Sequence, residues 1–355
     1  MEDYGGGGSS LPDDFLGGEA PQLRSLIIQD IGFNWSALRD NPVLRRLSHL
    51  HITSTPEDCR AGSECFLTLL ARMPSLQTCR LSDCFMNGED IPSTDSVTDI
   101  LILPRLSKLA LLGPMVAISG ILHYLRVQPR AEVSLACTLA GSTGGMLSFF
   151  NHRLNDPNRP PCRYLEHRLV GNSFSMQMHA NRTLLSAVDP EPLLDVRVMF
   201  REHHEAFMGL HNIVPLAEIH EWDLNVSASF GIHMLAAVFS RCENVVQLRL
   251  TNVSGIRQVF ESYLAPFRSP NEHDKKTAFL PNLRSIRLSG RYPLEGETFW
   301  TVVPGVMTER HKLLGILPSI TVEDPDGVRE YALETLLAMA ARVDIATAVD
   351  DILQV

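Results

Sequence analysis

One histidine-rich stretch, FREHHEAFMGLH, has residue types that could bind a metal ion. A zinc-protease motif places two histidines four positions apart, so that both lie on one helix face, with a glutamate directly after the first as the general base. Here His204 and Glu205 are followed by Met208 at the position where the second histidine is required. His203 and His211 have no cysteine partners nearby. We therefore interpret the stretch as a polar loop or helix and predict no metal site and no cofactor.

Two glycine-containing stretches have the composition of ligand-binding loops. AGSTGGMLS (140–148) lacks the Gly-Lys-Ser/Thr end of a phosphate loop and the Gly-x-Ser-x-Gly spacing of a nucleophile elbow. EDPDGVRE (323–330) lacks the ligand series and closing glutamate of a calcium loop. The first stretch predicts a turn between a strand and a helix, and the second a turn before a helix.

Arginine is the residue type that best supports binding chemistry here, because it recurs between two apolar residues of short strand-like segments. In a strand such a middle residue points away from the core. Arginine makes bidentate contacts with carboxylates and phosphates. We therefore hypothesise a basic ladder on the concave face of a sheet, interrupted by Asp223, that binds an acidic or phosphorylated protein partner. The alternative is that these side chains only solvate an exposed strand face. The candidate partner-binding residues are His51, Arg80, Arg197, Arg249 and Arg287.

Repeated Leu-x-x-Leu-x-Leu segments must position these side chains. Clear copies lie at Leu23/Leu26/Ile28, Leu47/Leu50/Ile52, Leu76/Cys79/Leu81, Leu106/Leu109/Leu111 and Leu283/Ile286/Leu288. Weaker copies lie at Leu193/Val196/Val198, Ile219/Trp222/Leu224 and Val245/Leu248/Leu250. Four clear copies share a Pro-x-Leu lead-in, as in PSLQTCRL and PNLRSIRL. Starts at 23, 47, 76 and 106 are 24, 29 and 30 residues apart, and those at 193, 219 and 245 are 26 apart, which is typical of leucine-rich repeats.

This pattern predicts an α/β fold, an irregular leucine-rich-repeat solenoid with parallel strands on the concave face and helices or loops on the convex face. We expect a Gly/Ser tail over 1–10 and the repeat region over 11–322, irregular at about 126–190. A C-terminal helical cap is expected over 323–355. GSECFLTLLARM and GIRQVFESYL have helical spacing, whereas AEVSLACTL and FSMQMHA alternate like strands.

Composition restricts the classes of partner. A net charge of -10 argues against binding to nucleic acid, which requires clustered lysine and arginine. No apolar run is long enough for a membrane helix, and MEDYGGGGSS does not resemble a signal peptide. We expect a cytoplasmic or nuclear protein with seven reduced, mostly buried cysteines.

LPDDFLGGEAPQLRSL, LPRLSKLALLGPMVAISGILHYL, AEVSLAC and FLPNLRSIRLSG together resemble the leucine-rich-repeat region of fungal F-box proteins over most of residues 11–290. The resemblance implies a module that selects a target for a cullin–RING ubiquitin ligase through a Skp-type adaptor. An F-box would need some forty residues of helical pattern, yet after LPDDFL the chain enters strand-like repeats. We therefore expect a non-enzymatic protein-interaction scaffold without its own F-box.

Two other interpretations remain open. One is a stand-alone leucine-rich-repeat binding protein with no link to ubiquitination. The other is an enzyme whose unrecognised site lies in the irregular 140–215 region, where five histidines could converge. They are His152, His167, His179, His203 and His204.

Overall fold

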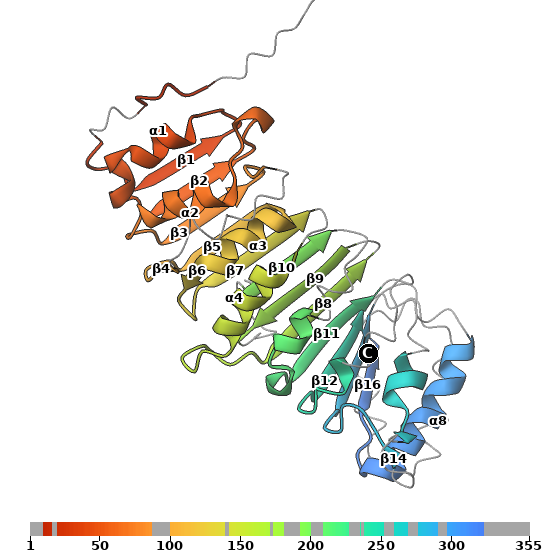
Figure 1. Ribbon diagram of the computed structural model, residues 1–355. Coiled ribbons are helices and arrows are strands. Elements are labelled where there is room, and N and C mark those ends of the chain that lie inside the picture. Colours follow the sequence, from red (N-terminus) through yellow and green to blue (C-terminus); the bar gives the residue numbers. More distant parts are fainter. Residues whose placement is uncertain are drawn as a thin grey trace, which may run out of the picture. The chain divides into compact units, whose positions relative to one another are not determined.

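The computed structural model describes a mixed α/β protein whose sheets are mostly parallel, as expected (Figure 1). The described residues are 10–15, 20–86, 100–138, 142–170, 173–180, 192–199, 209–226, 235, 238–251, 259–268, 276–289 and 297–322. The chain divides into two compact units. Unit 1 comprises residues 1–160 and 191–214, and unit 2 comprises residues 161–190 and 215–355. The expected helical cap at 323–355 lies outside the described residues.

Unit 1 contains a parallel sheet with the strand order β1-β2-β3-β5-β7-β10. The strands are β1 Ser25–Gln29, β2 His49–Thr53, β3 Thr78–Ser82, β5 Lys108–Pro114, β7 Glu132–Thr138 and β10 Leu194–Met199. A separate small sheet pairs β4 Leu101–Leu103 with β6 Leu125–Val127. The order follows the sequence, so most strands lie beside the next strand in the chain.

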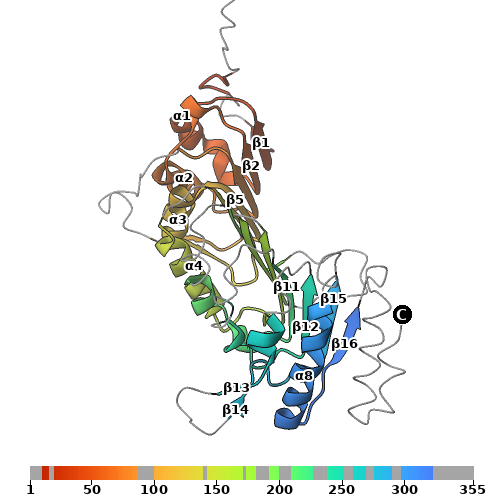
Figure 2. The ribbon, with the colours of Figure 1, turned by 90° about the vertical axis from the view of Figure 1, so that its right-hand side faces the viewer.

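Helices cover one face of this sheet, and Figure 2 shows α1 to α4 along that face. The helical segments are α1 Trp35–Asp40, η1 Pro42–Arg46, η2 Glu57–Cys59, α2 Ser63–Ala71, α3 Met115–Tyr124 and α4 Gly144–Leu154. Asn34 caps α1, because its side chain accepts a hydrogen bond from the Ser36 amide at 2.9 Å. The helix predicted for GSECFLTLLARM is α2, and α4 begins at Gly144 within the segment 140–148. We call the opposite face, on which no described helix lies, the outer face of unit 1.

A tight turn before the strand repeats along the chain and explains the Pro-x-Leu lead-in. In four copies the amide of the first leucine donates to the carbonyl three residues earlier: Leu23 to Ala20, Leu76 to Met73, Leu106 to Leu103 and Leu283 to Leu280. The proline is the second residue of each turn, where its fixed φ favours this geometry. The sequence repeat is therefore a repeat of backbone geometry.

The strand end is also repeated. Asp30, Ser54 and Asp83 directly follow β1, β2 and β3, and all three have a left-handed backbone, with φ between 52° and 55°. Each donates its amide to the next strand, as Asp83 does to the Leu112 carbonyl at 3.1 Å. Short polar side chains tolerate this conformation better than branched ones. The same residue position thus turns the chain away from the sheet in three consecutive copies.

Inward-facing apolar residues form the core of unit 1. Strand burial alternates, so that Leu50 and Ile52 of β2 are buried while His49 between the turn and Leu50 is exposed. Four aromatic rings continue this core from Phe33 through Trp35 and Phe66 to Phe85, with centroids 4.4, 4.6 and 4.7 Å apart. Such tilted ring contacts add to the stabilisation from apolar burial.

Unit 2 contains a sheet with the order β9-β8-β11-β12-β15-β16, in which only the β8–β9 pair is antiparallel among the described pairs. The strands are β8 Tyr164–Val170, β9 Ser173–His179, β11 Glu221–Val226, β12 Gln247–Thr251, β15 Ser285–Ser289 and β16 Ser319–Val322. The other elements are η3 Leu216–Glu218, η4 Phe260–Leu264, α8 Glu297–Leu314 and the short antiparallel pair β13 Phe267–Arg268 and β14 Lys276–Thr277. The strand predicted for FSMQMHA is confirmed as β9.

The core of unit 2 contains a fully buried arginine. Arg310 of α8 donates to the backbone carbonyls of Leu264, Phe279 and Leu280. Burial lowers its pKa to about 10, so the guanidinium stays charged at neutral pH. Its hydrogen bonds hold the segment before β15 in place, because a buried charge must be compensated by polar partners.

In the described part of the chain, no helix has the length and apolarity needed to cross a membrane.

Candidate functional site: the outer sheet faces

Strand register brings the predicted middle residues together on the outer face of unit 1. Ile27, His51, Arg80 and Ala110 occupy matching positions on β1, β2, β3 and β5. The same row continues with Ser134 of β7 and Asp195 of β10. Adjacent strands lie about 4.8 Å apart, so neighbouring members of the row can interact directly.

Arg197 is displaced from this row. It pairs with Ala136 rather than Ser134, which places it two residues further along the strands than Arg80 and Ala110. The Leu193/Val196/Val198 copy identifies the correct inward face of β10, but its middle residue is not the one aligned with the other copies. The predicted ladder in unit 1 is therefore corrected: Asp195, not Arg197, continues the row.

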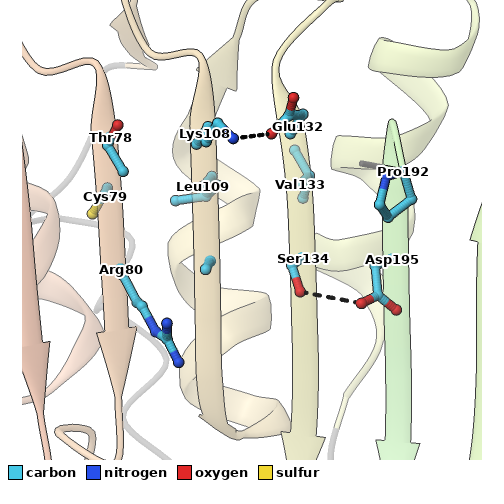
Figure 3. Close-up of a pocket in the computed structure, with 11 residues that line it drawn as sticks. Thr78, Cys79, Arg80, Lys108, Leu109, Glu132, Val133, Ser134, Pro192 and Asp195 are labelled. Carbon is cyan, nitrogen blue, oxygen red and sulfur yellow. Dashed lines mark hydrogen bonds and ion pairs between the residues drawn. The ribbon is translucent and has the colours of Figure 1, made fainter. Parts of the chain in front are cut away.

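A hollow of about 340 Å³ lies on this outer face (Figure 3). Its sides come from longer residues, whereas Ala110 and Ser134 between them are short. This difference in side-chain size creates the depression. The lining residues are Thr78, Cys79, Arg80, Lys108, Leu109, Ala110, Glu132, Val133, Ser134, Pro192 and Asp195.

Most charges of the hollow are paired. The ammonium of Lys108 lies 2.9 Å from a carboxylate oxygen of Glu132. Arg197 donates to Asp195 at 2.9 Å, and the Ser134 hydroxyl donates to the same carboxylate at 3.5 Å. Arg80 is exposed and extends from β3 toward β5, as Figure 3 shows, and no described residue forms an ion pair with it. The unbalanced charge of the hollow is therefore the single positive charge of Arg80.

His51 borders Arg80 on the neighbouring strand. Its Nε2 atom is buried and has no hydrogen-bond partner among the described residues. Burial lowers the pKa of His51, and the nearby charge of Arg80 lowers it further. At neutral pH this side chain is therefore uncharged, and the predicted ladder contains one cation fewer at this position.

Unit 2 has a corresponding row on the sheet face opposite its core, which we call the outer face of unit 2. Register pairs Asp223 with Arg249 and Arg249 with Arg287, as the ladder hypothesis requires. Asp223 lies 3.7 Å from the Arg249 guanidinium and also accepts hydrogen bonds from Tyr164 and Thr251, at 3.4 and 3.3 Å. Arg249 therefore lies beside a largely buried carboxylate.

Two of the five histidines in the enzyme hypothesis lie on opposite faces of the unit 2 sheet. His167 faces the core, where its Nδ1 accepts a hydrogen bond from the Trp222 indole at 3.1 Å. His179 pairs with Tyr164 on the outer face. His167 and His179 therefore do not form one site. His203 and His204 lie outside the described residues, and His152 is exposed on α4.

Cysteines and metal-binding clusters provide no alternative site in the described part of the chain. Five of the seven cysteines are buried, as expected. Burial raises the pKa of Cys79, Cys137 and Cys242 to about 12, so these thiols are poor nucleophiles. Among the described residues, no three histidine, cysteine or acidic side chains are grouped so as to hold a metal ion.

Sequence reasoning missed the residues of the hollow on β5, β7 and β10: Lys108, Glu132, Ser134 and Asp195. The alternation of AEVSLACTL identifies β7 as a strand, and its outward positions include Glu132 and Ser134. Their neighbours Lys108 on β5 and Asp195 on β10 can be identified only from the strand register.

No family model matches this chain, and no curated protein matches its sequence.

Proposed function

We propose that this protein is a protein–protein interaction scaffold, an irregular leucine-rich-repeat solenoid whose outer sheet faces bind an acidic or phosphorylated protein. The observation that carries the proposal is the alignment of Arg249 and Arg287 on adjacent strands, next to other polar outward residues. Side chains on adjacent parallel strands form a continuous surface that an extended segment of another protein can follow. The turns before the strands support the repeat interpretation, because they recur with the same hydrogen bond.

The more specific form of this proposal is a substrate-recognition module similar to those of F-box ubiquitin-ligase receptors. It rests on the sequence resemblance, which concerns mostly structural residues, and not on a site. A stand-alone binding module shares the same surface and differs only in whether a Skp-type adaptor joins the complex.

The test is affinity purification of the tagged chain from its native organism, followed by identification of bound proteins. We expect the double variant Arg249→Glu/Arg287→Glu to lose the partner that the wild-type chain retains, because reversed charges repel an acidic partner. Arg241→Glu/Lys312→Glu makes the same change in net charge at exposed positions outside the strands and should retain the partner.

Capture that is unchanged by the Arg249/Arg287 reversal would refute the role of this face. A Skp-type adaptor among the retained proteins would favour the ubiquitin-ligase form, and its absence from a complex that contains the partner would favour the stand-alone form. Circular dichroism of both variants checks that they are folded.

A further inference from the structure

The hollow on the outer face of unit 1 has a chemistry of its own. Lys108 and Glu132 compensate each other, as do Arg197 and Asp195, so these four groups contribute little net charge. Arg80 is exposed in the same hollow and has no ion-pair partner among the described residues. A group that enters the hollow therefore encounters one uncompensated guanidinium.

The two ends of the hollow differ in the side chains that line them. Arg80 is exposed and extends from β3 toward β5 (Figure 3), where its register partner is the short Ala110. The opposite side is occupied by Asp195, whose carboxylate is already paired with Arg197. An anion is therefore favoured at the β3–β5 end, beside the uncompensated charge of Arg80.

We propose that the hollow between β3 and β10 is a binding subsite for one anionic side chain of a partner protein, a carboxylate or a phosphate, held by the guanidinium of Arg80. The inference rests on the proposed interaction function and names the chemistry of the group that this surface recognises. Arg80 is the anchor because a free guanidinium offers two parallel N–H donors to a planar carboxylate or to a phosphate.

The unit 1 arginines differ in their suitability for this role. Arg197 already donates two hydrogen bonds to Asp195, so an incoming anion would compete with an internal carboxylate. Arg80 has no such competitor in the described part of the chain. A ligand therefore gains the full contact at Arg80 without breaking an existing pair.

The subsite can be tested on the full chain by a nuclear magnetic resonance titration. The probes are N-acetyl-glutamate amide, N-acetyl-phosphoserine amide and, as the uncharged match, N-acetyl-glutamine amide. The Arg80 Nε–Hε resonance is assigned by its loss in Arg80→Gln. We expect at least one anionic probe to shift this resonance and the glutamine probe to leave it unchanged. A response to phosphoserine alone would identify a phosphate-selective subsite, and a response to both a general anion subsite.

Two variants and one control complete the experiment. Arg80→Gln should weaken binding of the anionic probe about tenfold or more, since it removes a charge-assisted contact. Ala110→Leu should also weaken it, because the larger side chain fills the hollow while Arg80 is kept. Arg105→Gln removes an exposed arginine outside the hollow and should leave binding unchanged. Thermal unfolding of each variant checks the fold.

The proposal is overturned if neither anion shifts Arg80, if the glutamine probe binds equally well, or if Ala110→Leu binds like the wild-type chain. Failure of the wider function gives a different result. Suppose that the wild-type chain and Arg80→Gln both capture a partner, that the Arg249/Arg287 reversal does not, and that no probe binds. These results would support the interaction function and refute the subsite.

Discussion

Arg80 and Arg249 occupy the same position in their repeats but have different electrostatic surroundings. Arg80 has the small Ala110 beside it and no ion pair among the described residues, whereas Arg249 lies beside Asp223. The neighbours come from other strands: Ala110 is 30 residues from Arg80, and Asp223 is 26 residues from Arg249. A local sequence pattern therefore cannot distinguish the two sites. At the scale of the residue, the charge that an arginine presents depends on the neighbours that the adjacent strand contributes.

The low pKa of His51 makes stability depend on pH. Its folded-state pKa lies below the value in the unfolded chain, so the unfolded state binds the proton more readily. The free energy of unfolding should therefore fall as pH decreases through about 6.5, the usual histidine value. Besides Arg80, the groups that face His51 are Ile27 on β1, which carries no charge, and His49 on its own strand.

We expect His51→Gln to lose less stability than the wild-type chain between pH 7 and pH 5, as measured by urea unfolding at each pH. His49→Gln, at an exposed position two residues earlier on the same face, is the matched control and should behave like the wild-type chain. Equal acid sensitivity of His51→Gln and wild type would contradict the assignment.

The repeated turn explains why some strands can be predicted from the sequence and others cannot. β1, β2, β3, β5 and β15 follow the Pro-x-Leu or Leu-x-x-Leu-x-Leu pattern, because an identical turn sets the start of each strand. The turn before β7 ends at Ala131, one residue before the strand, whereas the turn before β5 ends at Leu106, two residues before it. Because this lead-in is one residue shorter, β7 does not follow the repeat pattern. A proline-rich segment precedes β8, which does not follow the pattern either. The hollow could not be predicted, because it needs the order of β3, β5, β7 and β10.

The contact between α3 and α4 gives a test at the scale of the element. A Cβ atom on Gly145 would lie 2.0 Å from the backbone carbonyl oxygen of Ser119, so the two helices would have to separate. We expect Gly145→Ala to reduce the free energy of unfolding by about 1–3 kcal/mol, the typical cost of overpacking. Gly144→Ala is the matched control, since its Cβ would meet only the Ser142 hydroxyl at 3.7 Å.

Urea unfolding measures both glycine variants. Gly144→Ala should change stability by less than about 1 kcal/mol, because alanine restricts the unfolded chain without a clash. If the two substitutions destabilise the protein equally, the close approach of α3 to α4 is wrong.

At the scale of the whole molecule, acidic residues outnumber basic ones by 41 to 31. A molecule with this balance repels polyanions at long range, although single arginines attract an anion at short range. The net charge of the chain therefore disfavours a polyanion such as duplex DNA as a partner. It does not disfavour a protein segment with isolated phosphate or carboxylate groups in the same way.

We expect the full chain to show no binding to a fluorescein-labelled duplex DNA at about 150 mM salt, measured by fluorescence anisotropy, and no gain as the salt is lowered. Binding that strengthens steeply at low salt would indicate release of counterions from the DNA and would contradict this prediction. The Arg249→Glu/Arg287→Glu variant would then show whether the outer face of unit 2 is responsible.

The alternation of inward and outward residues has a consequence for how such a protein can change over generations. In β5, Leu109 and Leu111 are buried, whereas Lys108 and Ala110 face outward into the hollow. Substitutions at the outward positions alter the chemistry offered to a partner and leave the packing of the core intact. Under the proposed interaction function, single substitutions at these outward positions would change the binding preference of the protein while its fold is kept.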